Sequence, residues 1–185
     1  MLLPIYMYGH PVLRKVAKDI KMDYPDLDKF LEDLWQTMYE ADGIGLAAPQ
    51  VGKSIRIFVV DGSLFEETDP RCKEWKQVFI NAHILERSGE DITKNEGCLS
   101  VPGIHEDVVR KEKITIAYKD EKGVDHLEEF DGIRARIIQH EYDHLDGKLF
   151  TDHLSLLKKR LLKGKLSSIS SGKLNIDYRF VLPGK

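Results

Sequence analysis

The chain has 185 residues, of which 42% are hydrophobic and 32% carry a charge. These values are typical of a soluble globular protein with a real core, and we predict one domain spanning residues 1–185. The formal net charge of −3 argues against binding to nucleic acid through bulk electrostatics, so we expect no specific nucleic-acid partner. No stretch approaches about 18 consecutive apolar residues, so we expect no membrane span.

The opening residues and the cysteines indicate the compartment. Met1 to Tyr6 contain neither the basic region nor the sustained apolar region of a secretory signal, so we expect none. The chain has two cysteines, Cys72 and Cys98. If Cys98 binds a metal, no structural disulfide can form, which indicates a reducing compartment. We therefore expect a cytoplasmic protein.

The N-terminal third predicts helices before the first strand. Pro11 to Lys18 opens with proline, which suits the first turn of a short helix. Asp26 to Ala41 predicts a longer helix, because its apolar residues recur at the spacing of a buried stripe. The residues of this stripe are Leu27, Phe30, Leu31, Leu34, Trp35, Met38 and Tyr39. The glycine-rich segment Gly43–Gly52, taken alone, indicates a turn and a buried strand. Ser54 to Asp61 predicts a strand.

The middle of the chain predicts mainly strands. Residues 61–77 are polar and predict an excursion on the surface. Val78 to Arg87 alternates as a strand with a bend at Asn81. Asp107 to Asp120 and Val124 to Phe130 predict a hairpin that turns at Lys122-Gly123. A helix is expected from Gly132 to Leu145.

The last segment, Leu154 to Lys173, predicts a basic amphipathic helix interrupted at Gly164. Its basic residues are Lys158, Lys159, Arg160, Lys163, Lys165 and Lys173, and its apolar residues are Leu154, Leu157, Leu161 and Leu162. We treat residues 154–185 as a basic C-terminal extension. Together the elements predict an α+β fold in which antiparallel or mixed strands pack around one central helix, 132–145, with an N-terminal and a C-terminal helix added.

The strongest chemical signal is the run Gln-His-Glu-Tyr-Asp-His at 139–144. On a helix, His140 and His144 lie one turn apart and project from the same face, so both imidazoles can reach one cation. Glu141 lies about 100° further round the helix axis, where it suits a general base. Ile133 and Ile137 continue the line of His140 as an apolar stripe, which favours an inward-facing metal site over a chance cluster on a solvated face.

A catalytic site of this type needs a third protein ligand. No glutamate follows Glu141, and Phe150 stands where an extended zinc-protease motif would have its third histidine. The weaker candidates are Asp146, Asp152, His153 and Asp177. The better candidate is Cys98 in Glu96–Ser100, because a thiolate is a strong ligand for iron, zinc or cobalt. Taken alone, however, Cys98 would more often be a small buried hydrophobe.

Three motifs occur in a fixed order: Gly-Ile-Gly-Leu-Ala-Ala-Pro-Gln at 43–50, Glu-Gly-Cys-Leu-Ser at 96–100, and Gln-His-Glu-x-x-His at 139–144. In this combination the sequence resembles the peptide deformylases, from about Tyr8 to about Asp152. The resemblance implies a bacterial, cytoplasmic, metal-dependent hydrolase of linear amides. Its substrate would be the N-terminal formyl-methionine of newly synthesised polypeptides, from which it would release formate. A contact between the basic C-terminal helix and ribosomal RNA or protein, near nascent chains, would fit this role.

The resemblance also implies the cofactor. One divalent ion would be held by Cys98, His140 and His144, with ferrous iron expected natively. The same donors also suit zinc, nickel or cobalt.

The remaining site residues follow from the same resemblance. Glu141 would move the proton, and the Gln50 side-chain amide and the Leu99 backbone N–H would hold the oxyanion. Ile44 and Gly45 would pair with the substrate backbone, with Gly97 approaching from the opposite side. Residues of the methionine slot would be Gly43, Ile44, Ile133 and Ile137.

Three side chains around this site carry more specific expectations. Glu96 is counted among the substrate-binding residues and is expected to hold the cysteine loop by pairing with Arg110. His105 stands where some bacterial members have an arginine for downstream substrate residues. Arg136 is expected to line the rim with its stem while its charge stays in water.

Two rival functions remain at the level of sequence. A metallopeptidase shares the His-Glu-x-x-His helix, but the missing downstream glutamate and Phe150 argue against it. A non-catalytic protein with a structural metal would normally supply four protein ligands.

Overall fold

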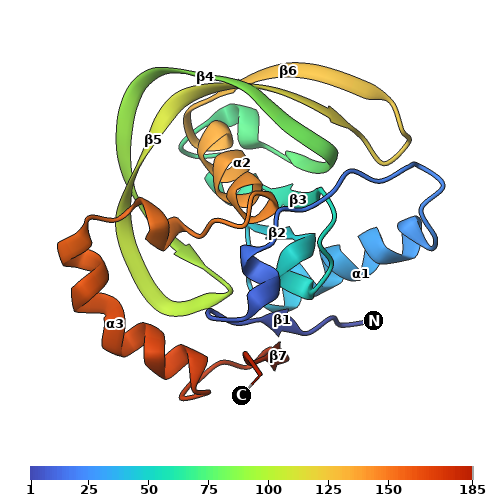
Figure 1. The fold of residues 1–185 in the computed structure, drawn as a ribbon. Helices are drawn as coiled ribbons and strands as arrows, with labels where there is room; N and C mark the ends of the chain where they lie inside the picture. The colour runs from blue at the N-terminus through green and yellow to red at the C-terminus, as the bar shows by residue number, and fades with distance from the viewer. Residues whose placement is uncertain (185) are drawn as a thin grey trace.

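The computed structural model describes residues 1–184 and has an α+β architecture (Figure 1). Lys185, the last residue of the predicted extension, lies outside the described residues. The helices are α1 (Leu27–Glu40), α2 (Gly132–Leu145) and α3 (Leu156–Ser170). The strands are β1 (Ile5–Tyr6), β2 (Gly45–Ala47), β3 (Ile57–Asp61), β4 (Lys76–Cys98), β5 (Val101–Lys119), β6 (Asp125–Asp131) and β7 (Phe180–Val181). None of the helices in this range is long and apolar enough to cross a bilayer.

Five strands form an antiparallel sheet in the order β2-β3-β4-β5-β6. The pairing of β4 with β5 shifts register four times along its length, between Ile80 and His83 among other places. Such irregularities increase twist and bend a strand pair. The long β4–β5 hairpin accordingly curls around α2, which lies inside the curved sheet (Figure 1).

Two hydrophobic clusters fill the interior. One lies between the sheet and α2, where the rings of Phe58 and Phe79 stack with centroids 4.6 Å apart. Ile138 and Leu145 of α2 are fully buried in this cluster. The other lies under α1 and contains the fully buried Leu34 and Met38. The predicted α+β fold and the helices at 26–41 and 132–145 are therefore confirmed to within a residue or two.

Several predicted elements begin or end at other residues in the structure. β4 does not end at Arg87 but continues to Cys98, and β5 begins at Val101 rather than at Asp107. The predicted helix 11–18 is only a 3₁₀ turn at Pro11–Arg14, because the backbone becomes extended at Lys15. The first long strand begins at Ile57 instead of Ser54.

The bend predicted at Asn81 is confirmed. Its φ of +52° is left-handed, and asparagine tolerates this region better than most residues. Its side chain also accepts a hydrogen bond from Ile20 N at 2.8 Å and donates one to Ile20 O at 2.7 Å. These contacts hold the N-terminal segment against the bend.

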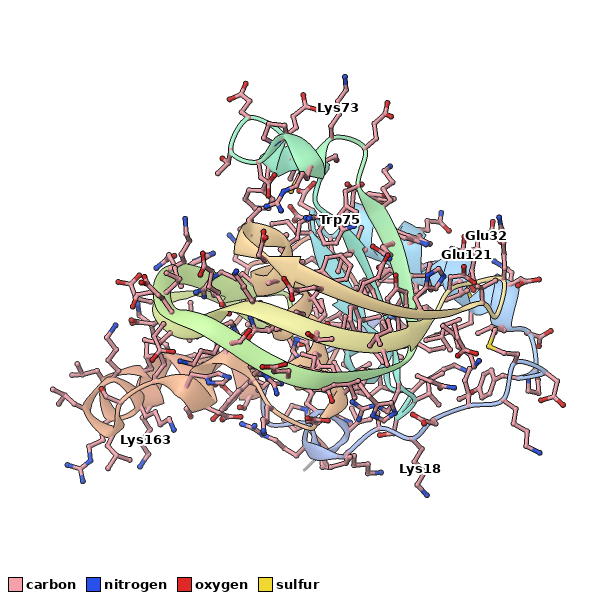
Figure 2. All side chains as sticks on the ribbon, turned by 90° about the horizontal axis from the view of Figure 1, so that it is seen from above. Lys18, Glu32, Lys73, Trp75, Glu121 and Lys163 are labelled. Atoms are coloured by element: carbon pink, nitrogen blue, oxygen red, sulfur yellow. The ribbon has the colours of Figure 1, made fainter. Side chains whose placement is uncertain are left out.

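The 61–77 excursion forms two 3₁₀ turns, Ser63–Phe65 and Pro70–Cys72. Figure 2 shows Lys73 at the outer end of this segment, far from Lys163 of α3. The excursion is nevertheless anchored, because the Cys72 side chain is fully buried. Asp61 fixes its beginning by accepting hydrogen bonds from the Ser63 backbone N–H at 3.0 Å and the Tyr39 hydroxyl at 2.8 Å. Tyr39 itself is exposed, so the predicted buried stripe of α1 is narrower than expected.

The C-terminal helix differs from its prediction in two ways. It is continuous through Gly164, so the predicted interruption is wrong. Its buried face consists of Leu162, Leu166 and Ile169, whereas Leu157 and Leu161 of the predicted apolar face are exposed. The chain then turns back, and β7 pairs in parallel with β1, so a segment near each end of the chain lies beside the other (Figure 1).

Candidate metal centre and active site

Cys98, His140 and His144 meet at one point inside the curved sheet. Cys98 ends β4, and both histidines project from α2, one turn apart. Their ligand atoms all lie within 4.8 Å of one another, and the Cys98 Sγ is 3.4 Å from His144 Nε2. The structure therefore brings together the three predicted metal ligands. Their placement depends on the curl of β4, because it carries Cys98 over the helix.

The three side chains fit a divalent cation. His140 Nδ1 lies 2.9 Å from Glu96 Oε2, which fixes the ring and leaves Nε2 as its ligand nitrogen. His144 Nδ1 is buried and has no hydrogen-bond partner among residues 1–184. One thiol and two imidazoles are a typical donor set for a four-coordinate site with one open position.

Glu96 sits beneath the centre in a buried ion-pair network. Its carboxylate accepts hydrogen bonds from Arg110 Nε at 2.6 Å, Arg110 Nη2 at 2.9 Å and Arg136 Nη1 at 2.6 Å. Burial alone would raise the pKa of Glu96, but hydrogen bonds from His140 and Arg110 hold that pKa well below its usual range. The predicted Glu96–Arg110 pair is confirmed.

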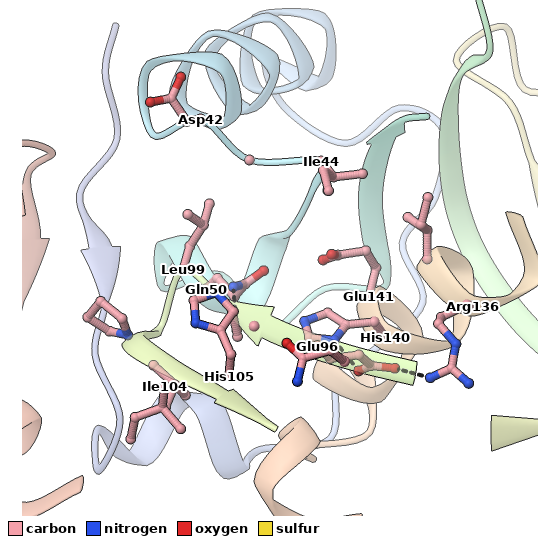
Figure 3. Close-up of a pocket in the computed structure, with 18 of the residues that line it drawn as sticks. Asp42, Ile44, Gln50, Glu96, Leu99, Ile104, His105, Arg136, His140 and Glu141 are labelled. Atoms are coloured by element: carbon pink, nitrogen blue, oxygen red, sulfur yellow. Dashed lines mark hydrogen bonds and ion pairs between the residues drawn. The ribbon is translucent and has the colours of Figure 1, made fainter. Parts of the chain in front are cut away.

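The expectation for Arg136 was wrong. Its charge does not stay in water: the side chain is buried and donates to Glu96 (Figure 3). It also donates to the Val108 carbonyl at 3.1 Å. The physical reason is the anionic Glu96, which Arg110 does not fully surround, so a second guanidinium completes its hydrogen bonds.

Asp143 is a buried member of this network that the sequence did not reveal. It accepts hydrogen bonds from Arg110 Nη1 and from His153 Nε2, both at 2.8 Å. Burial opposes its ionisation, but His153 and Arg110 lower the pKa of Asp143 to about 2. The sequence contained one indication of this role, because Asp143 lies three residues after His140 and therefore next to it on α2. His153, once a weak ligand candidate, instead pairs with Asp143.

Glu141 projects into the cavity beside the centre, between Ile44 and His140 in the view of Figure 3. Its Oε2 is buried and has no hydrogen-bond partner within the described part of the chain. Burial, followed by the nearby charges of Glu96 and Asp143, raises the pKa of Glu141 to about 7, although His140 and Arg110 oppose this shift. The carboxylate packs on β2: a Cβ added to Gly45 would overlap it. Glu141 thus lies where a proton-transfer group could reach a molecule in the cavity.

Gln50 and the Cys98-Leu99-Ser100 turn lie on the other side of the cavity from Glu141. Gln50 Oε1 accepts a hydrogen bond from Ala47 N at 2.9 Å, which orients the amide. Its Nε2 then donates to Ser100 Oγ at 3.2 Å and lies 3.5 Å from Cys98 Sγ. Gln50 and Leu99 both line the same cavity.

These groups line one cavity of about 480 Å³. Every predicted substrate-binding residue lines it: Gly43, Ile44, Gly45, Glu96, Gly97, Ile133 and Ile137. The glycines allow close approach, since a Cβ on Gly97 would lie 2.6 Å from His105 Cδ2 and one on Gly43 would lie 2.8 Å from Leu99 Cδ1.

Several lining residues were not predicted, and three of them come from distant segments of the chain. Phe65 comes from the excursion, and Ile176 and Tyr178 come from the segment before β7. Burial and the charge of Cys98 raise the pKa of Tyr178 to about 12. No local pattern marks these three, since each lies in a stretch without regular periodicity.

Comparison with known proteins identifies the family. The sequence matches the polypeptide deformylase family over residues 2–160. The chain belongs to the peptide deformylase family. A peptide deformylase of Christiangramia forsetii is 52% identical over 190 residues, covering 99% of this chain and 97% of that protein. A second, from Cytophaga hutchinsonii, is 49% identical and covers all of both chains.

The crystal structure of peptide deformylase from Thermus thermophilus is similar in fold, with a TM-score of 0.82 and 38% identity. The structural match covers 93% of this chain and 99% of the Thermus thermophilus chain. Peptide deformylases are hydrolases that depend on a divalent metal, in agreement with the Cys98, His140 and His144 cluster.

Proposed function

We propose that this peptide deformylase removes the formyl group from the N-terminal formyl-methionine of newly synthesised polypeptides and releases formate. The observation that carries the proposal is that Cys98, His140 and His144 meet beside an apolar-walled cavity lined by Glu141, whose buried Oε2 has no hydrogen-bond partner among residues 1–184. Membership of the family supplies the substrate class.

Cys98, His140 and His144 would hold the ion, which makes α2 the metal-binding helix. Ferrous iron is the native ion in this proposal, and zinc, nickel or cobalt can replace it because the same donors suit all four. When bound, the ion supplies Lewis acidity to the formyl carbonyl and to the attacking water. A structural site would have four protein ligands, whereas this cluster, within residues 1–184, supplies three.

Glu141 transfers the proton. Its Oε2 has no competing donor in the described structure, so it can accept a proton from water as that water attacks the formyl carbon. The carbon–nitrogen bond then breaks, and the same carboxyl gives the proton to the departing amine. The products are formate and a peptide with a free N-terminus.

Gln50 and Leu99 hold the oxyanion. The Gln50 N–H₂ donates without adding charge, and its orientation is fixed by the hydrogen bond from Ala47 N to Oε1. The Leu99 contribution is its backbone N–H, so its side chain should be partly replaceable. Fixed donors of this type stabilise charge that develops during the reaction.

The substrate backbone pairs with Ile44 and Gly45 as an added strand. β2 lies at the end of the sheet order and pairs, among residues 1–184, only with β3, so its other edge is available on the cavity side. Gly97 approaches from the β4 side. The methionine side chain fits against the apolar residues of the cavity, namely Gly43, Ile44, Ile133 and Ile137.

The remaining parts of the proposal concern context. We propose a cytoplasmic bacterial enzyme with one domain over residues 1–185, in which 154–185 form a basic extension. Exposed lysines of α3 would favour a contact with the ribosome near nascent chains, although Lys158 is engaged with Glu106 at 2.7 Å.

The deciding experiment is formate release from a formyl-methionyl tripeptide by protein loaded anaerobically with ferrous iron. A Glu141→Ala variant should lose several powers of ten in kcat/KM, because it removes the proton-transfer group. An unformylated tripeptide should remain uncleaved. Absence of formate release from folded, metal-loaded wild-type protein would contradict the proposal, and cleavage of the unformylated peptide would favour a metallopeptidase instead.

A further inference from the structure

The segment after α3 returns to the active site. β7 pairs with β1, and two flanking hydrogen bonds extend the contact: Ile5 N to Arg179 O and Met7 N to Val181 O, both 2.9 Å. Leu174, Ile176 and Leu182 pack against the cluster under α1. The segment is therefore held on both sides of Tyr178, by strand pairing after it and by apolar packing before it.

Tyr178 connects this segment to the metal-binding turn. Its side chain lines the cavity, and its hydroxyl donates a hydrogen bond of 2.7 Å to the backbone carbonyl of Leu99, 79 residues earlier in the chain. Leu99 and Ser100 are the two residues between β4 and β5, which close with Cys98 opposite Val101. Tyr178 thus holds the tip of the hairpin that carries Cys98.

Each contact on this turn holds a different atom. Ser100 O accepts from Tyr8 N at 2.8 Å, and Ser100 Oγ accepts from Gln50 Nε2 at 3.2 Å. The Leu99 carbonyl is held by Tyr178 alone among the side-chain hydrogen bonds of residues 1–184. Leu99 is also the residue whose N–H faces the substrate in the proposed mechanism, so a rotation of its peptide planes would misdirect that donor.

We propose that Tyr178 is a positioning residue that fixes the Cys98-Leu99-Ser100 turn, and with it the Leu99 N–H, for the deformylation reaction. The proposal rests on the proposed function. A displacement of about 1 Å at an oriented group can cost about a hundredfold in rate, so loss of one of three restraints should cost less than this. We expect kcat to fall about tenfold, with little change in KM.

The test compares Tyr178→Phe with Tyr24→Phe, both loaded with the same metal. Tyr178→Phe keeps the ring in the cavity and removes only the donor. Tyr24 packs at the edge of the cluster under α1, with Lys53 Nζ 5.7 Å from its ring centroid, and provides the same chemical change as a control. Steady-state formate release gives kcat and KM, and amide hydrogen exchange measured by mass spectrometry reports the mobility of residues 97–101.

The expected result is a tenfold lower kcat, a KM within twofold of wild type and faster exchange of residues 97–101 in Tyr178→Phe alone. Unchanged exchange would overturn the proposal. A raised KM with unchanged kcat would also overturn it, because Tyr178 would then bind substrate rather than position the turn. If the wild-type protein released no formate, the proposed function would fail, while the exchange comparison would still decide the role of Tyr178.

Discussion

Arg136 Nη1 and Arg110 Nε both lie 2.6 Å from the same atom, Glu96 Oε1, in the buried interior. Glu96 thereby links two guanidinium groups to His140, whose ring it also orients. Glu96→Gln would leave Arg136 as a buried cation without its anion. We expect a loss of about 3–5 kcal/mol in the free energy of unfolding, and metal affinity lower by about 10–100-fold.

Urea denaturation and competition with a metal-binding dye measure these two effects. Arg14→Gln is the matched control, because it breaks the Arg14–Asp152 ion pair, which is substantially exposed on both sides and should be worth less than about 1 kcal/mol. Equal stability of Glu96→Gln and wild type would contradict the network role.

Gly45→Ala should strongly reduce activity. A Cβ at this position would overlap the buried carboxylate of Glu141 and displace it. We expect kcat/KM to fall by at least about a hundredfold, since Glu141 would leave its place by the centre. Formate release and thermal unfolding are the measurements.

Gly164→Ala is the control for Gly45→Ala, because its Cβ would meet nothing within 4 Å and it lies inside α3. It should raise stability by about 0.5–1 kcal/mol and leave activity unchanged. Wild-type activity in Gly45→Ala would show that Glu141 is not confined as the structure indicates.

Glu141→Gln should lower the activity without lowering the stability of the protein. The buried Oε2 of Glu141 has no hydrogen-bond partner in the described residues, and burying an unpaired carboxylate is costly. The neutral amide has nearly the same shape, so the metal-free variant should be at least as stable as wild type at pH 7. Its kcat/KM should nevertheless fall by about 10²–10⁴. A clearly lower melting temperature of the metal-free variant would contradict this account.

Asp61 should contribute to the acid sensitivity of the fold. Burial alone would raise the pKa of Asp61, but hydrogen bonds from Ser63, Tyr39 and Lys76 outweigh it and hold that pKa below its usual value. A carboxylate with a lowered pKa stabilises the folded state above the unfolded-state value of about 3.9, and this stability is lost as the pH falls through the folded-state value.

Asp61→Asn should therefore be about 1.5–3 kcal/mol less stable than wild type at pH 7. The difference should shrink steadily below about pH 4. Urea midpoints between pH 2.5 and 7 measure it, with the exposed Asp23→Asn as control. A difference that stays constant over this range would rule out the ionised Asp61 as its cause.

Sequence patterns located the elements that have one buried face. The spacing of Leu34 and Met38 predicted α1, and the spacing of His140 and His144 placed both side chains on one face of α2. The segment 88–95 of β4 was missed because its residues are mostly exposed, so no alternation of apolar and polar residues marks it. Its strand structure comes from pairing with β5, a partner that lies beyond any local window.

The residues of the candidate site that lie within the three sequence motifs could be predicted from the sequence. Glu96 was placed with Arg110 correctly, but the second guanidinium, from Arg136, depended on how deeply the β4–β5 hairpin buries Glu96. Tyr178 could not be predicted, since nothing between α3 and β7 in sequence indicates that the chain returns to Leu99. A contact between segments so far apart in the chain is determined by tertiary packing rather than by local propensity.

The curl of β4 over α2 also determines when the centre can exist. Cys98 precedes His144 by 46 residues, and the thiol reaches the imidazoles only after the hairpin has closed around the helix. Before that step the chain offers two histidines one turn apart, which bind divalent ions weakly compared with the complete set of three. Because these donors suit several ions, we expect the bound ion to depend on which divalent ions are available when the site is completed.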